Sequence, residues 1–247
     1  MPLQFVDRPP DPVLNIVLYS GPGTGKTTGA LSAPGPILYL NAEGPNAAMF
    51  ARQQHPPGHI REVTVTGADT LREAVLHLRG SHEFGTVAVD SLGAVFQTVL
   101  EDMTGGGKPT LPQYGDTTTI LERFCRSLRD LPLNVVLVAH ETTVKDEESG
   151  VLERLPYTGT NNPALGVKLI AQVDITGYCG RVNPEADEKG DPRYLAQLFN
   201  GGGRRGKDRT GLLGDARDLD LSEWISTYTR AISSANPAQR ENRMVAA

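Results

Sequence analysis

The feature that most constrains this chain is a glycine-rich loop that follows an apolar run near the amino terminus. Residues 14–28 read LNIVLYSGPGTGKTT, so an apolar segment leads through a glycine-rich loop into Lys26 and Thr27. This order predicts a strand, a phosphate-binding loop (P-loop) and a helix, because glycines let backbone N–H groups turn inward toward phosphate oxygens. Ser20 stands where the usual motif has its first glycine, a variant that the neighbouring glycines make tolerable. The predicted phosphate-binding residues are Gly21, Pro22, Gly23, Thr24, Gly25, Lys26, Thr27 and Thr28.

Two further groups predict a Mg²⁺ ion beside the phosphates. Lys26 is expected to reach the β- and γ-phosphates, and the Thr27 hydroxyl is expected to hold the metal. The segment FGTVAVD ends at Asp90, which is the pattern of an apolar strand that delivers a carboxylate to the metal or its water shell. The sequence therefore predicts a site for a nucleoside triphosphate and Mg²⁺, with Thr27 and Asp90 as the metal-binding residues.

The bulk composition argues against several classes of protein. The chain has 247 residues and a net charge of −5, so it lacks the overall basic character of many nucleic-acid binders. No apolar run approaches the roughly 20 residues that span a bilayer, and the first residues do not resemble a secretory signal. The two cysteines match no metal spacing and are expected to be buried thiols. These features predict a cytoplasmic protein with no membrane partner.

Strand and helix patterns alternate through the first 140 residues. Strand patterns lie at 13–19, 36–41, 60–66, 86–90 and 134–140, and helix patterns lie at 26–31, 46–54, 70–78, 92–102 and 117–131. Alternation at this spacing predicts βαβ units with helices on both faces of the sheet. The expected fold class is therefore α/β, a three-layer P-loop nucleoside triphosphatase (NTPase) fold with a mostly parallel twisted sheet.

The rest of the chain predicts a single domain with appendages. Strand patterns at 172–181 and 194–199 precede a helix that begins near Ser222, with Trp224, Ile225, Tyr228 and Ile232 at helical spacing. We expect an arm at 1–12, one domain at 13–232 and a flexible tail at 233–247. Irregular insertions are expected at 103–118, 141–163 and 200–211.

Two residues that follow or end predicted strands are candidates for action on the nucleotide. Glu43 follows the strand at 36–41, and His140 ends the strand at 134–140. Both should lie at the carboxyl edge of the sheet, where α/β proteins bind their ligands. Glu43 is a candidate general base, although a lone glutamate after a strand is more often a solvated surface residue. His140 either senses the γ-phosphate or only caps its strand.

A basic segment stands out in this acidic chain. Residues 201–211, GGGRRGKDRTG, carry Arg204, Arg205, Lys207 and Arg209 against Asp208, a local charge of +3. They predict either a finger donated to a neighbouring subunit's γ-phosphate or a contact to nucleic-acid phosphates. Residues 104–118, with Lys108 and Tyr114, are candidates for a mobile nucleic-acid loop. Residues 141–157 have five acidic and two basic side chains, which argues against a phosphate clamp and equally suits a structural or regulatory hairpin.

The order of these motifs resembles the RecA-like recombinase ATPase core. The resemblance covers residues 13–211 and rests on SGPGTGKTT, YLNAEGPN, VAVDSLGAV, NVVLVAH and the Lys-Asp-Arg at 207–209. It implies that Glu43 is the catalytic base and that Lys207 and Arg209 are paired fingers that reach a neighbour's ATP. It also implies that 103–118 and 141–163 correspond to the two DNA-binding loops. His140 departs from the glutamine that the family usually has at this position.

The compact length is similar to phage-encoded RecA-like ATPases that act in single-strand annealing and recombination. This likeness implies ATP and Mg²⁺ as cofactors, single-stranded DNA as a partner, and a homo-oligomeric ring or filament with ATP at subunit interfaces. It also implies action beside a single-stranded-DNA-binding protein. Three other interpretations stay open: a motor related to hexameric helicases, a non-catalytic nucleotide-dependent assembly factor, and a small-molecule P-loop kinase.

Overall fold

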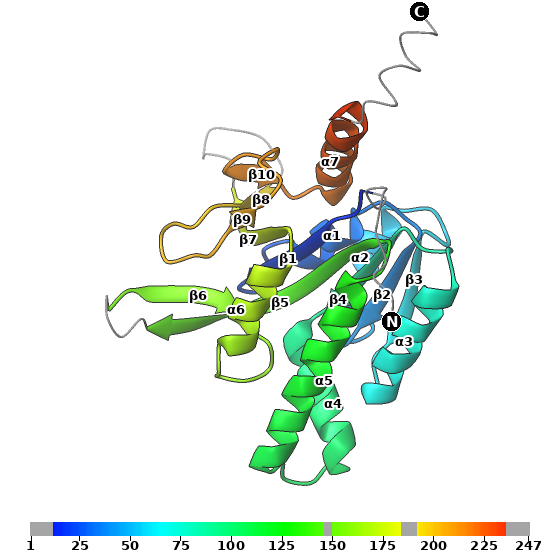
Figure 1. The fold of residues 1–247 in the computed structure, drawn as a ribbon, viewed down its shortest axis with the longest axis vertical. Coiled ribbons are helices and arrows are strands. Elements are labelled where there is room, and N and C mark those ends of the chain that lie inside the picture. Colours follow the sequence, from blue (N-terminus) through cyan, green and yellow to red (C-terminus); the bar gives the residue numbers. More distant parts are fainter. Residues whose placement is uncertain (1–11, 146–149, 184–191, 236–247) are drawn as a thin grey trace, which may run out of the picture.

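The fold is built around one mostly parallel sheet (Figure 1). The computed structural model describes residues 12–145, 150–183 and 192–235. Within these ranges ten strands form the sheet, in the order β10-β8-β7-β1-β5-β4-β2-β3, with β6 paired to β5 and β9 paired to β7. The strands are β1 (Asn15–Ser20), β2 (Ile37–Asn41), β3 (Ile60–Thr64), β4 (Thr86–Asp90), β5 (Asn134–Lys145), β6 (Leu152–Pro156), β7 (Ile175–Val182), β8 (Arg193–Gln197), β9 (Lys207–Asp208) and β10 (Ala216–Asp218). The helices are α1 (Lys26–Leu31), α2 (Met49–Gln53), α3 (Ala68–Gly80), α4 (Leu92–Thr104), α5 (Leu111–Arg129), α6 (Ala164–Gln172) and α7 (Leu221–Ala235).

Parallel pairing brings the carboxyl ends of the central strands to one edge of the sheet. β1 pairs in parallel with β5 and β7, β4 pairs in parallel with β5 and β2, and β2 pairs in parallel with β3. β5 therefore lies between β1, which leads into the glycine-rich loop, and β4, which ends at Asp90. Ser20 is in register with His140, and Asn41 with Asp90. The predicted site residues that follow or end these strands thus share one edge.

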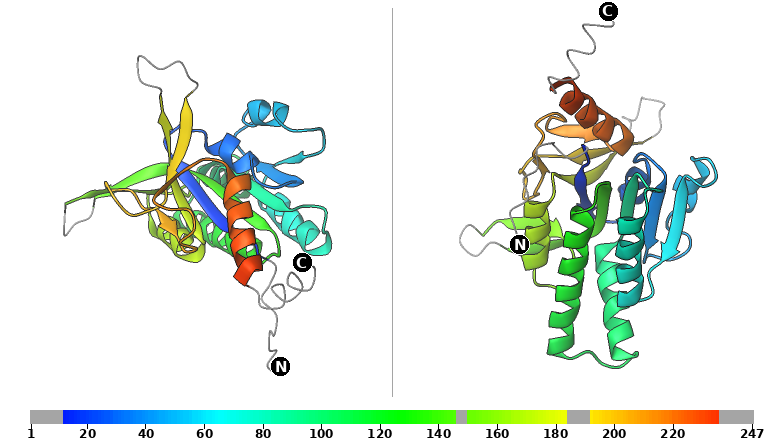
Figure 2. Two further views of the ribbon diagram at one scale, coloured as in Figure 1. Left: turned by 90° about the horizontal axis from the view of Figure 1, so that it is seen from above. Right: turned by 45° about the vertical axis from the view of Figure 1, so that its right-hand side comes forward.

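Alternating strand residues support two separate hydrophobic cores. Val17 and Tyr19 pack with buried residues of α3, α4, α5 and α6 on one face, while Ile16 and Leu18 pack with those of α1, α2 and α7 on the other. Figures 1 and 2 show α7 on the side of the sheet opposite to α4 and α5. The predicted α/β three-layer P-loop fold with a mostly parallel sheet is confirmed.

The structure corrects the predicted insertion at 103–118. Only residues 105–110 join α4 to α5, so the expected loop is mostly helix. The start of α5 is fixed by a capping box, in which the Thr110 side chain accepts from the backbone of Gln113 and the Gln113 side chain accepts from the backbone of Thr110, with a proline in the first turn. The glycines and prolines of this segment predicted a loop, whereas the proline stands at a position that favours helix initiation.

The other two predicted insertions contain regular structure as well. β5 continues past His140 to Lys145 and pairs antiparallel with β6, so 141–156 form a hairpin whose residues 146–149 lie outside the described ranges. Within the segment 200–211, β9 pairs with β7.

Of the predicted arm and tail, the structure describes only Pro12 and the end of α7 at 233–235. Cys125 and Cys179 are buried free thiols, as predicted. None of the helices in the described ranges has both the length and the apolar character that crossing a bilayer requires.

The two isoleucines of α7 offer a matched test of how this helix is anchored. Ile225 is 5% exposed and packs in the core that contains Ile16 and Leu18, whereas Ile232 is 38% exposed. We expect Ile225→Ala to lower the free energy of unfolding by about 2–5 kcal/mol, because it removes buried apolar volume and leaves a cavity. Ile232→Ala should change it by less than about 0.5 kcal/mol. Urea denaturation followed by circular dichroism measures both, and equal effects would contradict this packing of α7.

Candidate nucleotide site

The loop between β1 and α1 has the backbone of a phosphate cradle. Gly23 and Gly25 have φ values of 72° and 81°, a left-handed backbone conformation that residues with a side chain rarely adopt. Gly25 directly precedes the first residue of α1, so the loop turns into the helix there. The buried Ser20 hydroxyl lies 2.5 Å from the Thr24 hydroxyl. This contact uses the side chain that replaces the usual glycine, and it closes the loop on itself.

Lys26 is held inside this loop. Its side chain is buried, and Nζ donates a hydrogen bond of 2.6 Å to the Gly21 carbonyl oxygen. Burial lowers the pKa of Lys26, while Cys179, Asp90, Glu43 and Glu141 each act in the opposite direction. A phosphate oxygen is a stronger acceptor for an ammonium group than a carbonyl oxygen is. The position of Lys26 therefore suits a group that binds the phosphates of a nucleotide.

Thr27 and Asp90 bring two hard oxygen ligands together. The Thr27 hydroxyl donates to Asp90 Oδ2 at 2.6 Å, and the Tyr39 hydroxyl donates to the same oxygen at 3.2 Å. Burial raises the pKa of Asp90, and the hydrogen bond from Thr27 opposes this shift. No group of three or more acidic, histidine or cysteine side chains suited to a metal occurs in the described ranges. A hydroxyl and one carboxylate fit Mg²⁺, which takes few protein ligands and completes its shell with phosphate oxygens and water.

Glu43 lies beside His140 at the same edge. Its backbone N–H donates to the Asn41 side-chain oxygen at 2.8 Å, and the buried Asn41 in turn donates to Gly44 and Glu62. The Glu43 carboxylate accepts a hydrogen bond from Ser91 and lies 3.5 Å from His140 Nε2. Glu43 is 32% exposed and His140 is 42% exposed, so both side chains are open to solvent. The geometry places a carboxylate with two polar neighbours where it could take a proton from a water molecule.

These groups line a common pocket with a volume of about 340 Å³. It brings together most of the residues predicted for the phosphates, the metal and catalysis, and it adds two that the sequence did not indicate, Ala47 and Tyr194. Tyr194 belongs to β8, which carries no motif in the sequence, and only its pairing next to β7 brings it near the loop. The lining residues are Pro22, Gly23, Thr24, Gly25, Lys26, Thr27, Thr28, Glu43, Ala47, Asp90, His140 and Tyr194.

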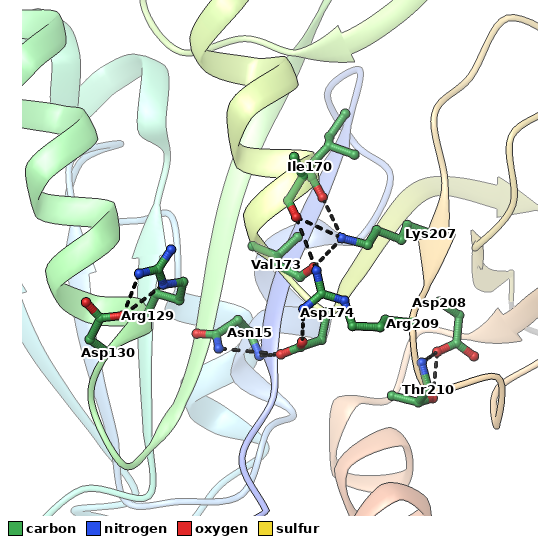
Figure 3. A network of polar contacts seen from close by, with 11 residues as sticks. Asn15, Arg129, Asp130, Ile170, Val173, Asp174, Lys207, Asp208, Arg209 and Thr210 are labelled. Carbon is green, nitrogen blue, oxygen red and sulfur yellow. Dashed lines mark hydrogen bonds and ion pairs between the residues drawn. The ribbon is translucent and has the colours of Figure 1, made fainter. Parts of the chain in front are cut away.

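The predicted fingers lie at the opposite edge of the sheet. Lys207 Nζ donates to the carbonyl oxygens of Ile170, Ala171 and Val173 at the end of α6 (Figure 3). Arg209 contacts the Asp174 carboxylate at 3.3 Å, and Asp174 also accepts from the backbone of Asn15 at the start of β1. Since β1 rises about 3.3 Å per residue, its start lies roughly 16 Å from Ser20 at the loop. Lys207 and Arg209 therefore lie away from the pocket.

The two other basic residues of this segment lie on the side of the β5–β6 hairpin. The Arg204 guanidinium stacks over the Tyr178 ring at 4.7 Å, and Arg205 Nη2 donates to both carboxylate oxygens of Glu153 of β6, at 2.8 and 2.7 Å. The Tyr19 hydroxyl contacts the backbone of Arg205 and the carbonyl of Arg154. Glu141, the first hairpin residue after His140, lies 3.7 Å from the position that a Cβ on Gly21 would occupy. The hairpin base is thus packed against the phosphate loop.

The fold and the site together define a P-loop ATPase of RecA-like architecture, in which β5 separates the strand before the loop from the strand that ends at Asp90. A family model described as an AAA domain matches residues 13–210, and the chain belongs to this family. Among solved structures, the chain is similar to the flagellar accessory protein FlaH from Methanocaldococcus jannaschii, with 10% identity over 80% of each chain and a TM-score of 0.42. A search of curated proteins found no match.

Asp90 offers a test of the metal position. Because burial raises its pKa, the ionised carboxylate disfavours the folded state at neutral pH, and this cost fades as the pH falls and Asp90 is protonated. We expect Asp90→Asn to raise the free energy of unfolding at pH 7, without nucleotide or Mg²⁺, by about 1 kcal/mol. The same variant should lose the added stability that Mg²⁺·ATP gives the native protein.

Urea denaturation with and without Mg²⁺·ATP measures both effects. Asp116→Asn, which removes an exposed carboxylate on α5, is the matched control and should change neither quantity. A variant at Asp90 that is stabilised by Mg²⁺·ATP as strongly as the native protein would exclude Asp90 from the metal site.

Proposed function

We propose that this chain hydrolyses ATP with Mg²⁺ in the cytoplasm and acts on single-stranded DNA in recombination or single-strand annealing. The observation that carries the ATPase part is the meeting of Lys26, Thr27, Asp90 and Glu43 in one pocket. These residues come from three places in the sequence, each at or after the end of a strand. Such a set supplies phosphate binding, metal binding and a base together.

Each side chain has a distinct role in this proposal. Lys26 binds the β- and γ-phosphates, and Thr27 and Asp90 hold the metal. Bound Mg²⁺ supplies charge neutralisation for the phosphates. Glu43 accepts the proton of the attacking water, and the contacts from Ser91 and His140 hold its carboxylate in place. His140 directly precedes Glu141 in β5, so in this proposal a change at the γ-phosphate alters the position of His140 and, through it, that of the hairpin.

The fingers act in trans in this proposal. Lys207 and Arg209 lie at the amino edge of the sheet, whereas the pocket lies at the carboxyl edge. This separation supports a homo-oligomer, a ring or a filament, in which the amino edge of one subunit faces the carboxyl edge of the next. Lys207 and Arg209 would then exchange their contacts with the end of α6 for the neighbour's phosphates.

The proposed DNA-contacting element is the β5–β6 hairpin together with the neighbouring basic segment. Figures 1 and 2 show the hairpin projecting away from the helical layers. Arg154 of β6 forms a backbone bridge with Arg204, which joins the hairpin to the basic segment. The Arg154 guanidinium lies 3.7 Å from Glu141, and that of Arg204 stacks over Tyr178. Contacts from these two groups to phosphates would give sequence-independent binding. A single-stranded-DNA-binding protein is the further partner that we propose.

Glu43→Gln is the variant that tests the chemistry. It keeps the shape of the side chain but removes the base, so we expect ATP turnover to fall by about 100-fold or more while ATP binding is retained. Glu101→Gln, an exposed carboxylate on α4, is the control and should turn over ATP as the native protein does. Turnover is measured with and without single-stranded DNA. If DNA changes neither turnover nor assembly in size-exclusion chromatography, the DNA part fails while the ATPase part stands.

Mixing two inactive variants tests the action in trans. Lys26→Ala removes the phosphate-binding lysine, and Arg209→Ala removes a finger, so we expect each variant alone to lose most of its turnover. In a mixture, some interfaces combine an intact loop with an intact finger, and activity should return in part. Arg217→Ala in place of Arg209→Ala controls for loss of a guanidinium elsewhere. A mixture that stays as inactive as its components would show that Arg209 does not act across an interface.

A further inference from the structure

We infer that the Tyr194 side chain forms the nucleobase subsite of this pocket, where the base stacks on its ring; this rests on the proposed ATP site. Tyr194 lines the same pocket as the phosphate cradle and the catalytic carboxylate. None of the motifs of the chain includes it. An aromatic ring offers any nucleobase a flat apolar surface, because every base has a π-face.

The order of the strands gives the nucleotide a direction across the sheet edge. Asp90 ends β4 and Glu43 follows β2, and both strands lie on the same side of β1. The metal and the attacked γ-phosphate must therefore lie on that side of the loop. Tyr194 belongs to β8, which lies beyond β7 on the other side of β1. A triphosphate held in the cradle with its γ end at Glu43 must direct its nucleoside toward Tyr194.

The Tyr194 ring is fixed in place against the loop. A Cβ added at Gly25 would lie 2.7 Å from a ring carbon of Tyr194, so the ring packs directly on the backbone where α1 begins. The backbone of Tyr194 is paired with Arg181 of β7 on one side and accepts a hydrogen bond from Leu219 on the other. A ring positioned in this way loses little conformational freedom when a base stacks on it.

The chemistry of this end of the pocket favours stacking over reading of the base edges. Most polar side chains among the described lining residues belong to the phosphate cradle, the metal site or the Glu43–His140 pair. Beyond these, the Tyr194 hydroxyl remains, and it has no hydrogen-bond partner among the residues that the structure describes. We therefore expect ATP and GTP to bind with similar affinity, since stacking is tolerant of base identity.

Binding to ligands with and without a base tests this assignment. Isothermal titration calorimetry compares Mg²⁺·ATP, Mg²⁺·GTP and Mg²⁺·tripolyphosphate on the native chain and on Tyr194→Ala, Tyr194→Leu and Tyr194→Phe. We expect Tyr194→Ala and Tyr194→Leu to weaken ATP and GTP binding by about 10-fold and to leave tripolyphosphate binding unchanged. Tyr194→Phe should bind all three ligands as the native chain does. Tyr194→Leu keeps an apolar side chain over Gly25, so it separates stacking from support of the loop.

Two results would overturn the inference. Unchanged ATP affinity in Tyr194→Ala and Tyr194→Leu would remove Tyr194 from the base subsite. An equal loss of ATP and tripolyphosphate binding would show that the ring only supports the phosphate loop. Lys26→Ala should weaken all three ligands, and a native chain that bound neither ATP nor tripolyphosphate would refute the proposed function itself.

Discussion

Parallel pairing of β1 with β5 is the constraint on which the rest of the site depends. It sets Ser20 in register with His140, so the phosphate loop and the start of the projecting hairpin leave the sheet at the same level. The next strand, β4, then delivers Asp90 to Thr27, and β2 brings Glu43 beside His140. A shift of one residue between β1 and β5 would reverse the faces of β5 and move His140 out of this edge. The register of apolar strands thus determines the chemistry at their ends.

The pocket concentrates buried charges of both signs, and burial shifts each toward its neutral form. The pKa of Lys26 is lowered and that of Asp90 is raised, in both cases chiefly by loss of solvent. A triphosphate with Mg²⁺ supplies the opposite charges that both groups require. Lys26 and Asp90 would therefore contribute more to the free energy of binding such a ligand than exposed charges could, because these two groups have already lost their solvent on folding. The same burial lowers the stability of the folded protein when no ligand is bound.

The local motifs predicted most of this site, and the long-range contacts are what the sequence did not show. Strand-loop-helix order predicted the cradle, and strand ends predicted the edge at which Asp90 and Glu43 lie, because parallel strands share an edge. Tyr194 could not be found in this way, since its place depends on the pairing of β8 with β7. The predicted start of α5, residue 117, lies after the observed start at Leu111, because glycine and proline are loop signals whereas Thr110 and Gln113 form a capping box.

The separation of the pocket from Lys207 and Arg209 restricts the kind of assembly that can use both. Any assembly that uses both must bring the amino edge of one subunit to the carboxyl edge of another. A two-fold axis does so only when both edges lie within one interface, because residue i of one subunit then contacts residue j of the other and the reverse. A head-to-tail contact needs only one edge from each subunit, and such contacts generate closed rings or open filaments. In either form, the lysine that now binds the end of α6 must leave three carbonyl oxygens before it can bind a phosphate. Assembly and ATP binding would then be thermodynamically linked, because each makes the finger's new position more favourable.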